Sequence, residues 1–308
     1  MTASSDELAA RVVEAFGRRV VVETADGTRM PAELFGKRVS VVCGDEVTLK
    51  PAAAGDAPRV VSVHPRRTSF ARTDSRGRAE PLAANLTLLC AVIAPQPEPD
   101  AYVIDRYLAG AAYAGIRSAV VVNKCDLPAA RNDEFTALLS EYRAAGYPVL
   151  ALSAHDRPSV DALADLVKGE VTMLVGQSGV GKSTLTNALV PSSARPTRTL
   201  SDATGEGRHT TTSTALFRIP GGGELIDSPG VRDYAPALVD DASVQYGWPE
   251  LVTLTPECRF NNCLHLREPG CAVLAAVENG ALATRRYESY KRLLNIMRGL
   301  APDYERRK

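Results

Sequence analysis

One stretch of the sequence combines glycines, a lysine and a hydroxyl side chain at a spacing suited to phosphate chemistry. Residues 176–183 read Gly-Gln-Ser-Gly-Val-Gly-Lys-Ser and fit the pattern G-x-x-x-x-G-K-[ST]. Backbone N–H groups of such a loop surround phosphates, while Lys182 would neutralise β- and γ-oxygens and Ser183 would bind Mg²⁺. An apolar strand pattern precedes the loop and a helical pattern follows it, as the motif requires. The predicted phosphate-binding residues are Gly176, Gln177, Ser178, Gly179, Val180, Gly181, Lys182, Ser183 and Thr184.

A second motif, N-K-x-D, follows the apolar run 120–122. The carboxylate of Asp126 could accept hydrogen bonds from N1–H and the exocyclic amino group of guanine, a donor pair that adenine lacks. Asn123 could order the loop, and the stem of Lys124 could cover the base. Ser153 and Ala154 follow the next predicted strand, and a backbone N–H there could donate to guanine O6. With the phosphate loop, this motif predicts guanine specificity, although alone it could be a solvated loop.

A third motif, D-x-x-G, ends the apolar run 224–226. We expect Asp227 to hold Mg²⁺ and the backbone N–H of Gly230 to contact the γ-phosphate. Upstream, three threonines at 210–212 offer a further magnesium ligand, with Thr211 as the middle choice. Three threonines in a row could equally form an edge strand.

The residue after D-x-x-G is Val231, where many GTPases place a glutamine that orients the attacking water. We therefore predict slow intrinsic hydrolysis that needs help from elsewhere. His209 is the best internal candidate for orienting water, and with Lys182 and Thr211 it forms the predicted catalytic set. The alternative, that His209 only shapes its loop, stays open.

The order of these motifs is unusual. N-K-x-D precedes the phosphate loop, which precedes D-x-x-G, whereas the common GTPase order begins with the phosphate loop. A circularly permuted sheet would bring the same residues to one site. Because the segment after D-x-x-G then leads into the C-terminal region, we hypothesise that nucleotide state repositions that region.

Four metal-binding side chains lie close together near the C-terminus. The pattern C-x4-C-x-H-x5-C supplies three thiolates and one imidazole, a complete tetrahedral set for one structural Zn²⁺. The predicted ligands are Cys258, Cys263, His265 and Cys271. The other three cysteines, Cys43, Cys90 and Cys125, lie in apolar runs and are predicted to be core residues.

The chain of 308 residues is long enough for several modest domains that position these motifs. Residues 1–16 are predicted to be a short helix or a frayed end. Short β-rich runs at 19–22, 38–42 and 46–49, with a turn dipeptide at 26–27, predict a small barrel of OB or SH3-like type. An arginine-rich linker at 64–78 follows.

Alternating strand and helix patterns then predict an α/β parallel sheet. Strands are expected at 86–93, 120–122, 149–152, 171–175 and 224–226, and helices at 132–145, 159–168 and 184–189. After residue 239 the strand pattern fades, and 287–300 is the clearest helix. The predicted divisions are an N-terminal extension (1–17), a β-barrel (18–80), a permuted GTPase domain (81–239) and a zinc-binding domain with a helical tail (240–308).

The net charge of the chain is zero, so only local charge can indicate partners. Six arginines lie between positions 59 and 78, and eight lysines or arginines between 285 and 308. Each patch alone is better explained as a solvated surface, but with a barrel and a zinc module they favour RNA binding. No run is long and apolar enough to predict a membrane span, so a cytosolic location is expected. A monomer is expected because no apolar helix face is left unassigned.

At this point the chain resembles the ribosome small subunit-dependent GTPase A family of circularly permuted bacterial GTPases. The strings that carry the resemblance are 207–212 (GRHTTT), 227–232 (DSPGVR) and 258–271 (CRFNNCLHLREPGC). The resemblance implies an N-terminal OB-fold, a permuted GTPase domain and a zinc-binding domain. It also implies action in late maturation of the 30S ribosomal subunit and its 16S rRNA, with GTP hydrolysis to GDP stimulated by that subunit.

Three other functions are compatible with parts of the sequence. A GTP-dependent binding switch with incidental hydrolysis is kept open by Val231. A small-molecule ATPase or kinase is opposed by N-K-x-D. A permuted GTPase acting on the large subunit or another RNA is opposed only through the resemblance.

Overall fold

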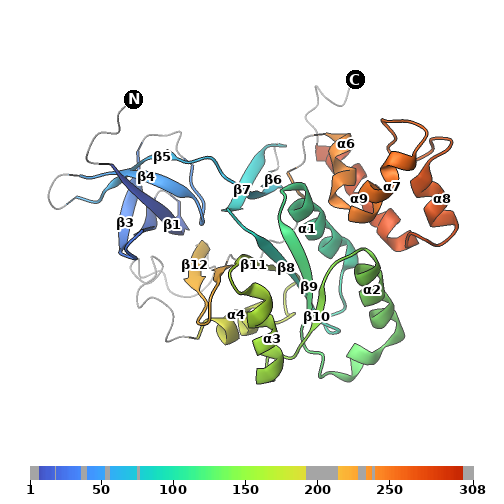
Figure 1. Cartoon of the computed structure of the whole chain (residues 1–308), viewed down its shortest axis with the longest axis horizontal. Helices are drawn as coiled ribbons and strands as arrows, with labels where there is room; N and C mark the ends of the chain where they lie inside the picture. Colours follow the sequence, from blue (N-terminus) through green and yellow to red (C-terminus); the bar gives the residue numbers. More distant parts are fainter. Residues whose placement is uncertain are drawn as a thin grey trace.

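The computed structural model describes most of the chain. The described residues are 7–17, 19–35, 40–52, 56–74, 77–191, 214–227, 234–237 and 240–300. Figure 1 shows a β-barrel and a helical C-terminal domain on opposite sides of a central α/β domain. The predicted residues Gly207, His209, Thr210, Thr211, Thr212, Gly230 and Val231 lie outside the described residues.

The barrel contains five strands: β1 (Leu8–Phe16), β2 (Arg19–Thr24), β3 (Arg29–Leu34), β4 (Glu46–Lys50) and β5 (Arg59–Val63). They pair in the order β1-β2-β3-β5-β4, and β4 pairs with β1 to close the ring. Only the β3–β5 pair is parallel. Alternate side chains, such as Val20 and Val22, point into an apolar core. This is the small closed barrel of an OB-fold, as predicted.

The prediction of a helix or frayed end over residues 1–16 is wrong, because Leu8–Phe16 forms β1. Its alanine-rich composition favours a helix, but β1 pairs with both β2 and β4 and buries Val12 and Val13 completely. Burial against the barrel therefore outweighs local helix propensity. The barrel begins with β1, within the range predicted as an extension.

The strand predicted at 38–42 is also not found in the described residues 40–42. The buried Asp45 side chain accepts the Val42 N–H at 2.9 Å and the Arg66 Nε–H at 2.7 Å. Between them Gly44 has φ of 95°, and a Cβ there would lie 2.1 Å from the Ala84 carbonyl oxygen. A tight turn held by Asp45 replaces the strand.

Residues 64–78, predicted as a linker, contribute to a hairpin. Strands β6 (Ser69–Thr73) and β7 (Ala79–Ala84) pair antiparallel and lead directly into the central sheet. Figure 1 shows this hairpin between the barrel and helix α1. The hairpin therefore forms the connection between the barrel and the GTPase domain.

The central sheet has the order β10-β9-β8-β11-β13-β12. Its parallel strands are β8 (Leu88–Ile93), β9 (Arg117–Val122), β10 (Val149–Ala151), β11 (Val171–Val175) and β13 (Glu224–Asp227). The next strand, β12 (Thr214–Arg218), is antiparallel to β13 and also pairs with β1 of the barrel. Helices α1 (Ala101–Tyr113) and α2 (Asp133–Ala144) cover one face, and the 3₁₀ turn η1 (Pro128–Arg131) precedes α2. Helices α3 (Arg157–Val167) and α4 (Lys182–Leu189) cover the other. This confirms the predicted α/β sheet.

The C-terminal domain is built from helices and 3₁₀ turns around the buried Trp248. Its elements are α6 (Asp241–Val244), η3 (Gln245–Gly247), α7 (Pro249–Leu254), η4 (Thr255–Glu257), α8 (Ala272–Glu278) and α9 (Thr284–Leu300). A Cβ on Gly247 would lie 2.5 Å from the Ala109 Cβ, so η3 packs tightly on α1. Within the described residues, no helix combines the length and apolar character needed to cross a membrane.

Candidate functional site

The phosphate loop joins β11 to α4 at the carboxyl end of the parallel strands. Gly176 has φ of 143°, and a Cβ there would lie 2.2 Å from the Val92 carbonyl oxygen. Gly181 caps α4 in the left-handed region, with φ of 95°. These positions accept only glycine, because other residues would be strained or would clash. The loop thus directs its backbone N–H groups into the start of a helix.

Lys182 lies over this loop. Its Nζ donates to the carbonyl oxygens of Gly176 and Gln177, both at 2.7 Å. Ser183 and Thr184 follow in the exposed first turn of α4. The ammonium group is therefore held above the loop, where the β- and γ-phosphates of a nucleotide would lie.

Asn123 connects the base-reading motif to the phosphate loop. Its side chain is buried, and Nδ2 donates to the Val180 carbonyl oxygen at 2.9 Å. Its Oδ1 accepts the Ala154 N–H at 3.1 Å. A Cβ on Gly181 would lie 2.2 Å from Asn123 Nδ2, so the loop and the amide fit closely. One side chain thus ties together three segments that are far apart in the sequence.

Lys124 makes a parallel connection. Its Nζ donates to the carbonyl oxygens of Gly179 at 2.6 Å and Gln96 at 3.0 Å. Its backbone has φ of 60°, a conformation that non-glycine residues seldom adopt outside functional loops. The lysine stem therefore runs from the N-K-x-D loop towards the phosphate loop.

Asp126 is exposed beside this loop. Hydrogen bonding from Ser153 lowers the pKa of the Asp126 carboxyl below its ordinary value, with a smaller effect from its own backbone N–H. The carboxyl is therefore ionised at neutral pH and can accept two donors at once. The backbone N–H of Ala154 is engaged by Asn123, and that of Ser153 donates to Ser159 Oγ at 3.2 Å. The predicted donation to guanine O6 stays a prediction.

Asp227 ends β13, which lies beside β11 in parallel register. It pairs with Ala215 of β12, which fixes its backbone at the carboxyl end of the sheet. Because the phosphate loop leaves β11 at the same edge, Asp227 and Ser183 lie on adjacent segments. The magnesium role of Asp227 and Ser183 stays a prediction.

The loop after β8 was missed by sequence reasoning. The Asp100 N–H donates to Gln177 Oε1 at 2.9 Å, and its carboxylate caps α1 through Tyr102 N–H at 3.0 Å. Pro97 lies 3.6 Å from where a Gly179 Cβ would be. A proline-rich run at the carboxyl end of a buried strand is the signal that could have identified this wall of the site.

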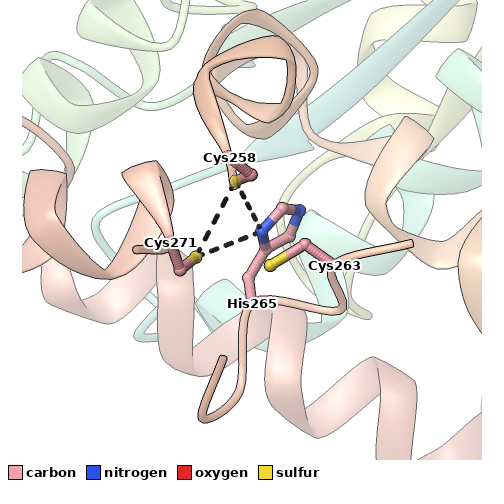
Figure 2. Close-up of side chains that lie close together, drawn as sticks. All are labelled: Cys258, Cys263, His265 and Cys271. Carbon is pink, nitrogen blue, oxygen red and sulfur yellow. Dashed lines mark hydrogen bonds between the residues drawn. The ribbon is translucent and has the colours of Figure 1, made fainter. Parts of the chain in front are cut away.

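The four predicted zinc ligands lie together between α7 and α8 (Figure 2), with ligand atoms within 4.8 Å of one another. His265 Nδ1 is 3.6 Å from Cys258 Sγ and 3.4 Å from Cys271 Sγ, and those sulfurs are 3.9 Å apart. Tetrahedral Zn²⁺, with Zn–S of about 2.3 Å and Zn–N of about 2.05 Å, needs separations of about 3.6 and 3.8 Å. Cys263, the fourth ligand, is almost fully buried. The set therefore fits zinc and keeps no position for a substrate.

The imidazole of His265 is oriented from outside the cluster. Its Nε2 lies 2.9 Å from Gln245 Oε1 and 3.2 Å from Thr255 Oγ1. The amide oxygen can only accept, so Nε2 carries the proton and Nδ1 is the ligating nitrogen. Tyr287 Oη donates to the His265 carbonyl oxygen at 2.7 Å, which fixes the backbone. The sequence motif did not reveal Gln245, which lies 20 positions upstream.

The remaining cysteines differ from one another. Cys43 and Cys90 are fully buried, as predicted, and burial raises the pKa of the Cys90 thiol to about 12. Cys125 is exposed, so its assignment to the core is wrong. Its position in N-K-x-D places it in a loop just beyond the buried strand β9.

The basic patches are largely neutralised within the chain. Four of the five described arginines between 59 and 78 pair with acids, in the pairs Arg66–Asp45, Arg67–Glu46, Arg72–Glu80 and Arg78–Asp74. In α9, Arg285 and Arg286 pair with Asp105 in the α/β domain. Local charge counts alone therefore overstate the surface available to a phosphate backbone.

Comparisons with known proteins agree with this geometry. The RsgA GTPase family matches residues 63–236. The "Small ribosomal subunit biogenesis GTPase RsgA" of Pseudomonas aeruginosa is 43% identical over 292 residues, which cover 94% of this chain and 86% of that protein. The protein of the same name from Pseudomonas fluorescens is 43% identical over 288 residues, which cover 92% and 84%.

Two solved structures share the fold. YjeQ from Thermotoga maritima superposes with a TM-score of 0.72 at 26% identity, covering 94% of this chain and 98% of that one. YloQ, described as a circularly permuted GTPase, superposes with a TM-score of 0.73 at 22% identity, covering 99% of both chains. The permuted order of the motifs thus corresponds to a known architecture.

Proposed function

We propose that this chain, which belongs to the RsgA GTPase family, hydrolyses GTP on the small ribosomal subunit and acts in the late maturation of that subunit. It is a GTPase, and its relatives are named for small ribosomal subunit biogenesis. The 30S subunit with its 16S rRNA is the proposed partner, and GTP and GDP are the proposed ligands. A cytoplasmic monomer is the proposed state.

The observation that carries the nucleotide assignment is the double hydrogen bond of Asn123, to Val180 of the phosphate loop and to Ala154. It supports one site in which both ends of a guanine nucleotide are bound. Asp126 would recognise the base, and Lys182 would neutralise the phosphates.

Bound Mg²⁺ would supply charge neutralisation between the β- and γ-phosphates, and Ser183 and Asp227 would hold it. Thr211 is proposed as a third ligand and His209 as the group that orients water. The side chain of Val231 can neither bind Mg²⁺ nor orient water, so His209 or a group from the ribosome must orient the attacking water.

The proposed zinc ion is structural, held by Cys258, Cys263, His265 and Cys271. Two of its ligands, Cys263 and Cys271, lie in the buried apolar core of the C-terminal domain together with Trp248 and Tyr287. Zinc would therefore stabilise the domain that packs on α1.

The deciding experiment measures steady-state GTP turnover by the purified protein alone, with 30S subunits, and with 50S subunits as the control. We expect 30S subunits to stimulate GTP turnover strongly and 50S subunits to leave it unchanged. Equal stimulation by both subunits, or by neither, would remove the 30S assignment and favour another RNA, while the nucleotide site would stand.

A further inference from the structure

Residues 234–237 lie downstream of D-x-x-G and pair with the β6–β7 hairpin. An antiparallel bridge joins Arg72 to Pro236. Thr73 donates its backbone N–H to the Ala235 carbonyl oxygen at 2.8 Å and its hydroxyl to that of Pro236 at 2.9 Å. This segment thus forms an isolated β-bridge to the hairpin, although the sequence contains no strand pattern there.

The ring of Tyr234 is held between the hairpin and α1. Its centroid lies 5.0 Å from that of Phe70 in β6 and 4.9 Å from that of Tyr107 in α1, with interplanar angles of 14° and 26°. Its hydroxyl donates to the Ala71 carbonyl oxygen at 3.1 Å, and the side chain is fully buried. Stacked aromatic pairs add stabilisation beyond the area that they bury, so this ring is a firm anchor.

Helix α1 is shaped to admit this ring. A Cβ on Gly110 would lie 2.0 Å from the Tyr234 hydroxyl oxygen and 2.9 Å from Cζ of the same ring. Glycine inside a helix costs about 1 kcal/mol relative to alanine. The helix therefore carries a destabilising residue at the position where Tyr234 needs space.

Only six residues separate this anchor from Asp227, whose backbone is fixed in β13 by pairing with Ala215. The two residues are therefore joined by a covalent connection that can span at most about 25 Å. The hairpin that holds the ring also connects the barrel to β8.

We propose that Tyr234 is a positioning residue for GTP hydrolysis, which transmits the placement of the β6–β7 hairpin to the magnesium end of the nucleotide site. The inference rests on the proposed role of Asp227. A partner that moves the barrel or the hairpin then alters GTP turnover through this ring, without touching the nucleotide.

The test compares Tyr234→Ala, Tyr234→Phe and Gly110→Ala in GTP turnover, with and without 30S subunits, and in GDP affinity. Gly247→Ala is the matched control. Its added Cβ would also crowd helix α1, but at Ala109 and not at Tyr234. Thermal unfolding and circular dichroism establish that each variant is folded.

Tyr234→Ala and Gly110→Ala are expected to lower kcat about tenfold, since small misplacements near reacting groups are costly. GDP affinity should stay within about twofold, because that loss lies in the chemical step. Tyr234→Phe, which keeps the stacking, should restore most of the turnover, and Gly247→Ala should keep it.

Folded Tyr234→Ala with wild-type turnover in both conditions would overturn the proposal. So would a parallel loss of GDP affinity and kcat, which would indicate a structural role only. If Tyr234→Ala does not fold, Phe70→Leu, which removes one stacking partner, takes its place with the same expectations. Asp227→Ala separates the two proposals: wild-type turnover there overturns the role of Asp227 and this inference together.

Discussion

Nη1 of Arg286 in α9 lies 2.6 Å from Oδ1 of Asp105 in α1, and this ion pair joins the C-terminal domain to the GTPase domain. Both side chains are at most 2% exposed. Arg285 Nη1 reaches the other carboxylate oxygen at 2.7 Å, and Arg286 Nε reaches Glu250 at 2.6 Å. We call this the α1–α9 clamp.

Asp105→Ala would leave two guanidinium groups of the clamp without their shared carboxylate. Removing one partner of a buried pair costs about 3–5 kcal/mol, so the free energy of unfolding should fall by that order. Chemical denaturation measures it. Arg298→Ala is the control, because its pair with Asp241 is 40% and 41% exposed and should contribute at most about 1 kcal/mol. Equal losses in both variants would contradict the role of the clamp.

The clamp also bears on whether nucleotide state moves the C-terminal domain, as the motif order suggests. With α9 fixed to α1, we expect a distance between labels at Lys168 and Asn295, both exposed, to be the same with GDP and a non-hydrolysable GTP analogue. Electron spin resonance measures it. A difference of several ångströms would instead support the hypothesis of domain movement. Any such movement should be larger in Asp105→Ala, which lacks the clamp.

Asp126→Asn should exchange guanine for xanthine specificity. A site built to hydrogen-bond a ligand loses on the order of a hundredfold or more in affinity when the pairing is lost, so GTP binding should weaken accordingly. Xanthosine triphosphate has a carbonyl oxygen where guanine has its exocyclic amino group, so the variant should bind it more tightly than GTP. Equilibrium binding of both nucleotides, with wild type as reference, decides it, and unchanged GTP affinity would contradict the assignment.

The same carboxyl sets an expectation for pH. Guanine recognition needs the ionised form, and the folded pKa of Asp126 lies below its ordinary value. Its contribution is therefore fully present above the ordinary carboxyl pKa of about 4 and is lost only as pH falls through the lower folded value. GTP affinity should not change through Asp126 between about pH 5 and 7.

Gly181→Ala should abolish nucleotide binding, because its Cβ would lie 2.2 Å from Asn123 Nδ2. Gly146→Ala is a close control: its φ is +86° against +95° at Gly181, but nothing lies within 4 Å of its Cβ. The control should lose about 1–2 kcal/mol of stability and keep GDP affinity. If both variants bind GDP equally well, the fit between the loop and Asn123 is not required.

Gln245→Ala tests the orientation of the zinc-ligating imidazole. Loss of such a partner lowers metal affinity about 10- to 100-fold. Competition with a zinc chelator should show this, with Thr253→Ala as a control, whose hydroxyl donates only to the Pro249 carbonyl oxygen. Zinc retention equal to wild type would show that Thr255 alone orients the ring.

Contiguous motifs next to buried strands were predictable from the sequence. Asn123 directly follows β9, Lys182 begins α4, and Cys258 and Cys271 lie in one cluster, because local spacing defines both sites. What failed depends on distant partners. β1 has a composition typical of a helix, but it pairs with β4. From the sequence alone Arg286 is assigned as a surface charge, whereas in the fold it is buried in an ion pair with Asp105. Tyr234 carried no signal, because its neighbours Phe70 and Tyr107 are far away in sequence.

The pairing of β1 with β12 makes the barrel and the central sheet one sheet of 11 strands. Ion pairs of Arg11 with Glu224 and of Arg218 with Glu23 reinforce the seam. An antiparallel strand at the end of a sheet would otherwise offer its backbone to any extended chain. The barrel therefore also acts as a built-in shield against strand-to-strand aggregation, and a fragment that lacks it would be expected to self-associate through β12.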